Sequence, residues 1–259
     1  MIGYYVHHQG RGHLHHAQCI AAHVPGPSTI LSSLPRPNAW HRPWVALPPD
    51  DTVDPVDATA QGRLHWVPLH HDGHRERMGI LARWIAQTRP AVFVSDVSVE
   101  VAVLVRLLGI PVVVAAMRGD RQDEAHRLGY DLANVLLAPW PGSLPEPGWP
   151  AHWHAKAVHT GSISRYDGRP RPMTRCGGNR PGADNEVVVM LGAGGADITP
   201  EQLREAAEAT PDWSWTVLGG PGTHWVEDPW PLLCRASVVI THAGRTPSRS
   251  APQRACPPS

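Results

Sequence analysis

Several residue types and patterns that mark common protein classes are scarce or missing in this chain. Only four of its 259 residues are cysteine, with no CxxC pair, so the sequence indicates neither a zinc site nor a disulfide framework. The N-terminus lacks a basic segment followed by an apolar core, and no run reaches the roughly 18 consecutive apolar residues of a membrane span. These absences favour a reduced cytoplasmic setting and leave a peripheral membrane contact open.

Net charge is missing as well, because 23 basic residues balance 23 acidic ones. A chain without excess charge has no overall electrostatic attraction to nucleic acid, so we expect no nucleic-acid partner. Lys156 is the only lysine, and arginine supplies nearly all of the basic charge. That bias is typical of a GC-rich coding sequence and does not by itself indicate a functional arginine surface.

The most informative stretch lies between residues 187 and 209 and predicts a strand, a glycine turn and a helix. Residues 187–191 form a continuous apolar run, as expected of a parallel strand covered on both faces. Thr199 can cap the helix, Pro200 suits its first position, and Gln202 completes a capping box. Between strand and helix lie three glycines that allow close backbone approach to a ligand: Gly192, Gly194 and Gly195.

This arrangement has a functional and a structural interpretation. Free backbone N–H groups and the positive end of a helix dipole suit a phosphate, so the turn can be a nucleotide-phosphate site. The same glycines can equally form a βα turn that binds no ligand. The remaining motifs shift the balance between the two interpretations.

Strands and helices alternate along the rest of the chain, which predicts an α/β fold with parallel sheets and right-handed crossovers. We expect strands at residues 2–6, 28–33, 44–47, 63–69, 91–94, 111–116 and 134–139, with helices at 13–23, within 71–89 and at 99–108. Residues 140–182 lack periodicity and are expected to contain the domain connection. A second winding then adds strands at 187–191, 213–219 and 237–241, with a short segment at 231–235.

Ligands of such sheets bind at the carboxyl ends of the strands. The loops of interest are therefore residues 10–13, 95–98 and 117–123. In the first of them, Gly10 and Gly12 precede His13 in a GxGH pattern directly after the first strand.

The GxGH loop, the glycine turn of the second half and the later VVITHAG sequence, in this order, resemble a glycosyltransferase of the GT-B fold. The likeness is to bacterial enzymes related to the family 28-like peptidoglycan N-acetylglucosaminyltransferase, and it covers nearly all of residues 1–244. It implies two Rossmann-like domains, an acceptor domain at 1–165 and an incomplete nucleotide-sugar domain at 183–244, joined by a linker at 166–182.

The resemblance also implies roles for particular residues. His13 would be the general base, and Gly10, Gly12 and Asp96 would belong to the acceptor-side loops. The donor, a nucleotide diphosphate sugar and most often a UDP sugar, would be bound without a metal or cofactor. Its site would comprise Gly192, Gly194, Gly195, His242, Ala243 and Gly244. The acceptor stays open between a lipid-linked molecule and a small molecule.

Each of these roles has a structural alternative. His13 can simply cap or pack at its helix start. Asp96 can either orient His13 or cap the next helix, for which the position favours capping, and Ser98 is the other candidate for that cap. His70, His71 and His74 surround Asp72, but they lack the spacing of a zinc motif, so we interpret them as solvated residues.

The end of the chain departs from the family pattern. After Gly244 the sequence becomes RTPSRSAPQRACPPS, where the family has a helix. Back-translation with GC-rich codons, reread one base over, gives NAIAERTAASVPAV, an amphipathic helix followed by a strand start. The sequence therefore suggests a frameshifted, disordered tail at 245–259 and a truncated donor domain.

Three functions stay open on this basis. The first is a glycosyltransferase, and the second is a non-hydrolysing nucleotide-sugar epimerase, which shares the two-domain fold. The third is a non-catalytic nucleotide-binding remnant, which the altered C-terminus favours. An NAD-dependent dehydrogenase is disfavoured because GRGHLH lacks the third glycine of the dinucleotide-binding pattern.

Overall fold

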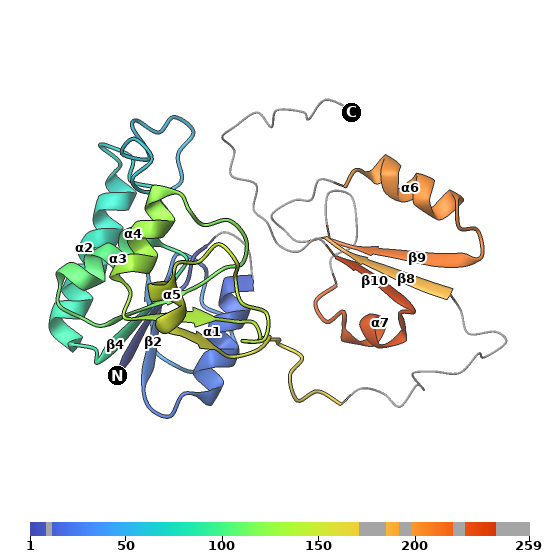
Figure 1. The fold of residues 1–259 in the computed structure, drawn as a ribbon, viewed down its shortest axis with the longest axis horizontal. Helices are drawn as coiled ribbons and strands as arrows, with labels where there is room; N and C mark the ends of the chain where they lie inside the picture. The colour runs from blue at the N-terminus through green and yellow to red at the C-terminus, as the bar shows by residue number, and fades with distance from the viewer. Residues whose placement is uncertain (9–11, 171–184, 192–197, 220–225, 242–259) are drawn as a thin grey trace. The chain divides into compact units, whose positions relative to one another are not determined.

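The structure is a computed structural model that describes residues 1–8, 12–170, 185–191, 198–219 and 226–241. The chain divides into two compact units, Met1–Asp167 and Gly168–Ser259, which are coloured blue to yellow and yellow to red in Figure 1. No helix within the described residues combines the length and apolar character that a bilayer crossing requires.

The first unit is built on a seven-stranded sheet in the order β3-β2-β1-β4-β5-β6-β7, with every neighbouring pair parallel. The chain winds from β1 towards β3 and then returns past β1 to build the other half. The strands are β1 (Ile2–Tyr5), β2 (Ser28–Ser32), β3 (Trp44–Ala46), β4 (Val92–Asp96), β5 (Val112–Ala115), β6 (Val135–Ala138) and β7 (Ala157–His159).

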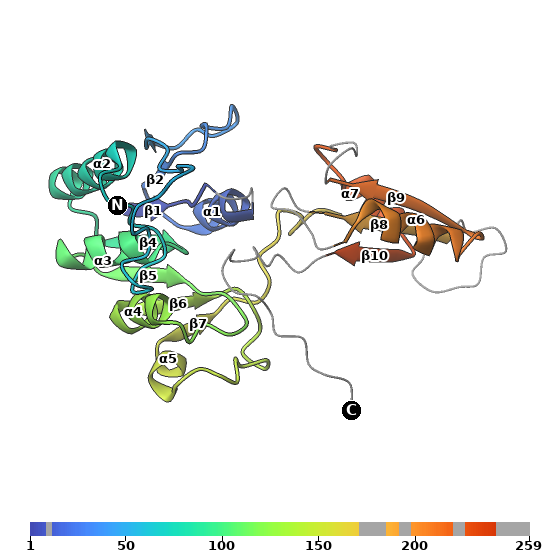
Figure 2. The same ribbon diagram turned by 90° about the horizontal axis from the view of Figure 1, so that it is seen from above.

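This reversal of winding distributes the helices over both faces of the sheet. Right-handed crossovers in opposite directions place α1 (Gly12–His23) on one face and α2 (Asp72–Thr88), α3 (Val99–Leu107) and α4 (Glu124–Leu132) on the other, as Figure 2 shows. Successive side chains of β1 therefore enter different hydrophobic clusters. Tyr4 packs in the cluster on the α1 side, and Tyr5 packs in the cluster on the side of α2, α3 and α4.

One glycine of β1 is required by this packing. Gly3 pairs in register with Phe93, and a Cβ atom at Gly3 would lie only 2.4 Å from the Phe93 ring and 2.8 Å from the Trp84 ring. The aromatic side chains therefore pack directly on the backbone of the central strand.

The second unit has a parallel three-stranded sheet among its described residues, in the order β10-β8-β9. Its elements are β8 (Asn185–Met190), α6 (Pro200–Glu208), β9 (Trp213–Leu218), α7 (Trp230–Arg235) and β10 (Val238–Thr241). The winding again reverses at β8, and Figure 1 shows α6 and α7 on opposite sides of the strands. Both units thus confirm the predicted α/β class with parallel sheets.

One part of the sequence-based assignment is wrong, and three elements were not predicted. Residues 63–69 form turns and no strand, because their backbone bonds stay within the loop or go to a side chain: Val67 N–H donates to Ala58 O, and His65 N–H donates to Glu100. Residues 140–182, which are expected to contain the domain connection, also hold α5 (Ala151–Ala155) and β7, and neither element was predicted. These elements are too short to show a period. Helix α4 was also absent from the prediction.

Candidate active site at the switch point of the first sheet

The two central strands of the first unit mark the place where a ligand site is expected. β1 and β4 are hydrogen-bonded neighbours, and the helices that follow them, α1 and α3, lie on opposite faces of the sheet. In open parallel sheets, this divergence leaves a crevice at the carboxyl ends of the two strands. His13 lies in the first turn of α1, and Asp96 is the last residue of β4.

His13 and Asp96 are joined at this point by a hydrogen bond. The His13 Nδ1 atom lies 3.0 Å from Asp96 Oδ1, although the residues are 83 positions apart. The Asp96 side chain is 3% exposed and that of His13 is 25% exposed, so the pair reaches solvent through the imidazole. A carboxylate that accepts from Nδ1–H holds the ring and directs Nε2 elsewhere.

The capping interpretation of Asp96 is therefore wrong. Ser98 is the N-cap of α3, and its hydroxyl accepts from the Val101 N–H at 3.3 Å. Between the two residues, Val97 has a left-handed backbone with φ of 60°. A β-branched residue in this region costs about 1–3 kcal/mol, and such strain clusters at functional sites. The turn separates the two roles, since Ser98 caps the helix while Asp96 faces His13.

The pKa of His13 shows the balance of forces in the pair. Burial of the imidazole lowers its pKa, but the hydrogen bond and the negative charge of Asp96 outweigh burial, so the pKa lies above the ordinary value. Tyr4 lies on the side of the sheet that α1 covers. Burial raises the pKa of the Tyr4 hydroxyl, and the nearby charge of Asp96 raises it further. Asp96 therefore favours the protonated imidazole and the neutral phenol.

Two further histidines extend this group and were not singled out from the sequence. His7 and His8 lie shortly after the end of β1. Their rings stack at 4.8 Å between centroids, and the His7 ring meets that of His13 edge-on at 6.0 Å. Burial, and then the charges of His8 and His13, lower the pKa of His7 to about 3. His7 is therefore a neutral neighbour. Its position shortly after the strand was the available signal.

A buried ion pair lies near the carboxyl edge of the same sheet, between α2 and the loop after β3. Asp50 and Arg77 are 4% and 2% exposed, and Arg77 Nη1 lies 2.5 Å from Asp50 Oδ2. The His74 Nδ1 atom lies 3.5 Å from the same oxygen, and Arg77 also donates to the Pro48 carbonyl at 2.9 Å. Burial raises the pKa of Asp50, but the His74 hydrogen bond and the Arg77 charge lower it below the ordinary value. The pair fastens the loop after β3 to α2.

The histidines at 70, 71 and 74 do not gather around a common point in the described part of the chain. His71 is the N-cap of α2, where its Nδ1 accepts from the His74 N–H at 3.1 Å, while the His74 side chain faces Asp50. His70 has a left-handed backbone with φ of 60° in the preceding turn. The roles of His71 and His74 are thus capping and pairing.

The donor-side prediction is only partly within the described residues. The predicted capping box of α6 is confirmed: Thr199 N–H donates to Gln202 Oε1 at 2.9 Å, and Gln202 N–H donates to Thr199 Oγ1 at 3.2 Å. The strands before both predicted loops are neighbours, since Met190 and Thr241 are register partners. Gly10 and the proposed donor residues lie outside the described residues: Gly192, Gly194, Gly195, His242, Ala243 and Gly244.

Comparison with solved structures identifies the fold. The glycotransferase of kitacinnamycin matches with a TM-score of 0.54 and 18% identity, over 94% of this chain and 75% of that one. The Phytolacca americana UGT2, complexed with UDP-2-fluoro-glucose and pterostilbene, matches at 0.53 and 14%, over 94% and 71%. A UDP-N-acetylglucosamine 2-epimerase matches at 0.50 and 10%, over 92% and 73%.

The two parallel sheets and these likenesses show that the chain has the GT-B fold. No protein-family model and no curated protein sequence matches it.

Proposed function

We propose that this protein is a glycosyltransferase that transfers a sugar from a nucleotide diphosphate donor to an acceptor hydroxyl. The observation that carries the proposal is the His13–Asp96 hydrogen bond of 3.0 Å at the switch point of the acceptor-side sheet. A histidine oriented by a buried carboxylate is suited to general base catalysis. The relation to the peptidoglycan N-acetylglucosaminyltransferases is part of the proposal.

In this mechanism His13 Nε2 accepts the proton of the acceptor hydroxyl while the oxygen attacks the anomeric carbon of the sugar. The bond from that carbon to the diphosphate oxygen breaks, and its electron pair leaves with the nucleoside diphosphate. Asp96 accepts the hydrogen bond from Nδ1 and stabilises the imidazolium that forms. Asp96 is thus a positioning residue, and His13 is the catalytic base.

The donor phosphates would lie at the glycine turn before α6. The capped N-terminus of α6 presents backbone N–H groups and a positive dipole end, which suit the charge that develops on the leaving diphosphate. Residues Gly192, Gly194 and Gly195 would form one wall and His242, Ala243 and Gly244 the other. This arrangement uses no metal or cofactor. The UDP sugar named in the Phytolacca structure supports a donor of this class.

The acceptor in this proposal is a lipid-linked or small molecule bearing a hydroxyl group. The loops that bind the acceptor would be those at the carboxyl edge of the first sheet, where His13 lies. The proposed setting is the cytoplasm, with a peripheral membrane contact if the acceptor is lipid-linked.

A transfer assay tests the proposal. The purified chain is incubated with UDP and dTDP sugars and a panel of lipid and small-molecule acceptors, and nucleoside diphosphate release and product mass are followed. His13→Ala should lower the rate by at least about 100-fold, as expected for loss of a general base. His152→Ala is the matched control, because His152 also pairs with an aspartate, Asp131, but on the surface. Equal rates for the His13 variant and the control would remove His13 from the mechanism.

A nucleotide-sugar epimerase is the second candidate, because a UDP-N-acetylglucosamine 2-epimerase shares the fold at a TM-score of 0.50. An epimerase converts the donor with no acceptor present, so sugar epimers formed from a UDP sugar alone would favour it. Binding of UDP without turnover in either assay would instead indicate a non-catalytic nucleotide-binding protein.

A further inference from the structure

A second cluster of histidine and carboxylate groups lies in the first unit, apart from the His13 pair. The His65 Nε2 atom lies 3.4 Å from Asp123 Oδ1, and the His126 Nδ1 atom lies 2.5 Å from Asp123 Oδ2. One donor atom from each of the three residues lies within 4.8 Å of the others. His65 belongs to the loop before α2, while Asp123 and His126 belong to the start of α4.

The three side chains are a recognised type of metal-ligand set. Two imidazoles and one carboxylate bind zinc in many proteins, with a fourth position left for water. Zinc–ligand bonds of about 2.0–2.2 Å in a tetrahedron separate the ligand atoms by about 3.3–3.6 Å. The His65 Nε2 atom lies 3.4 Å from one oxygen of Asp123, and the His126 Nδ1 atom lies 2.5 Å from the other. One ligand atom from each residue lies within 4.8 Å of the others, so side-chain adjustments of about 1 Å would bring the three to the tetrahedral spacing.

The cluster is held in place from several sides. The backbone N–H groups of His65 and Trp66 both donate to Glu100 Oε1, at 2.7 and 3.0 Å, which fixes the His65 loop to α3. Arg63 Nε lies 2.9 Å from Glu124 Oε2, which joins the same loop to α4. These contacts do not involve the side chains of the three candidate ligands. The loop would therefore present His65 at this point with or without an ion.

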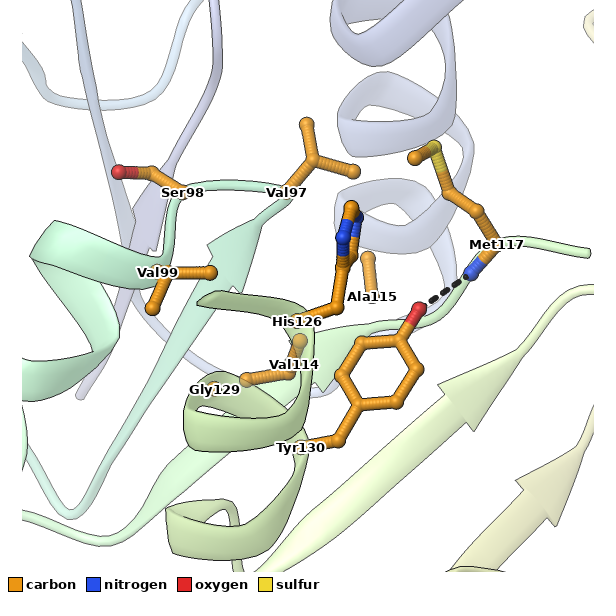
Figure 3. A pocket seen from close by; sticks show the side chains of 9 residues that line it. All are labelled: Val97, Ser98, Val99, Val114, Ala115, Met117, His126, Gly129 and Tyr130. Carbon is orange, nitrogen blue, oxygen red and sulfur yellow. Dashed lines mark hydrogen bonds between the residues drawn. The ribbon is translucent and has the colours of Figure 1, made fainter. Parts of the chain in front are cut away.

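The remaining two ligands are fixed by α4. Asp123 is its N-cap and accepts from the His126 N–H at 3.0 Å, which sets the direction of the carboxylate. The His126 side chain is 16% exposed and lines a small pocket at the end of β5, beside Met117 and Tyr130 (Figure 3). The Met117 N–H donates to the Tyr130 hydroxyl at 3.0 Å and closes the pocket wall. The cluster is thus packed on one side through His126, while His65 and Asp123 are exposed to solvent.

We propose that His65, Asp123 and His126 form a binding site for one zinc ion. The bound ion would join the loop before α2 to the start of α4 at the carboxyl edge of the sheet. The proposal does not depend on the transferase activity. The three residues lie 58 and 3 positions apart, so no motif search along the sequence would find them.

Metal binding by the full chain tests this site directly. The protein is stripped of metal with a chelator and titrated with zinc in a calorimeter, and with cobalt while the visible absorption of four-coordinate Co²⁺ is recorded. The expected result is one tight zinc equivalent and a cobalt spectrum of the four-coordinate type. His65→Ala and Asp123→Asn should each weaken zinc binding by at least about 10-fold, since even the partners of metal ligands contribute that much.

The two variants separate ligation from folding. Asparagine caps a helix as well as aspartate does, so Asp123→Asn keeps α4 intact while removing the charged ligand. His152→Ala is the control for surface binding, because its exposed pair with Asp131 has only two of the three groups. Far-ultraviolet circular dichroism confirms that each variant is folded. Unchanged zinc affinity in both ligand variants, or no tight equivalent in the parent chain, would overturn the proposal.

Discussion

Replacing Asp96 by asparagine separates the charge of this residue from its position. The side chain is 3% exposed, and an amide oxygen can take the place of Oδ1 at 3.0 Å from His13 Nδ1. A hydrogen bond to a charged group contributes about 1.5–3 kcal/mol, and a neutral one about 0.5–1.5 kcal/mol. Asp96→Asn should therefore weaken the interaction with protonated His13 by about 1 kcal/mol.

The effect depends on pH in a defined direction. Since the folded-state pKa of His13 is raised above its unfolded value, the pair stabilises the fold fully below the unfolded pKa of about 6.5. This contribution is lost as the pH rises through the folded pKa. Asp96→Asn should consequently lower the free energy of unfolding by about 1 kcal/mol more near pH 6 than near pH 9.

Two measurements check this reasoning. Urea unfolding at both pH values gives the difference in free energy, and NMR titration of the imidazole gives the His13 pKa, which should fall in Asp96→Asn. Asp131→Asn is the control, because it alters a His–Asp pair on the surface and should leave His13 unchanged. An unaltered His13 pKa in Asp96→Asn, or a loss of stability that is the same at both pH values, would refute the pairing.

The same variant reports on the proposed chemistry. A base must be neutral to accept a proton, so the acid limb of the rate profile follows the His13 pKa. In Asp96→Asn this limb should move to lower pH while the plateau rate falls, because the imidazolium loses its charged partner. A purely structural role of Asp96 would lower the rate without moving the limb.

Three other outcomes follow from the packing of the first unit. Gly3→Ala should lower the unfolding free energy by about 1–3 kcal/mol, because the new Cβ would lie 2.4 Å from the Phe93 ring; an unaltered urea midpoint would contradict that contact. Arg77→Met should cost about 3–5 kcal/mol in the same assay, because it leaves Asp50 buried without its partner, and a loss below about 1 kcal/mol would argue against the ion pair. Burial holds the pKa of His7 near 3, so on acidification the unfolded chain binds a proton at His7 before the folded protein does, and the unfolding free energy should fall from about pH 6.5 towards pH 3. His7→Gln should make the unfolding free energy less dependent on pH in this range. An equal pH dependence in the variant would exclude His7 as its source.

Local sequence signals were sufficient for most of the fold. The helix start at Thr199 was predictable because the capping box lies within four consecutive positions. Residues 63–69 misled for the opposite reason: their apolar alternation suits a strand, but Glu100, 35 positions away, takes up the His65 N–H. Helix α5 and strand β7 are so short that their residues show no period.

The candidate site shows where prediction from sequence ended. His13 could be identified from the GxGH pattern and its resemblance to a known family. The alternatives for Asp96 could not be decided, because its position before a helix suits a cap and its partner lies 83 residues away. Only the structure shows that Ser98 takes the cap. The set of His65, Asp123 and His126 likewise depends on a loop conformation that the sequence did not predict.

The central place of β1 has a consequence for how the protein is made. Ile2 pairs with Val92 on one side and with Ser28 on the other, so β1 is an interior strand whose partner β4 is synthesised about 90 residues later. At a synthesis rate of roughly 5–20 residues per second, β1 waits about 5–20 s for β4. During this time one of its edges and much of its apolar surface are unprotected. A nascent chain that ends before β4 cannot complete this core, so chaperone supply and translation speed should limit the yield of folded protein in cells.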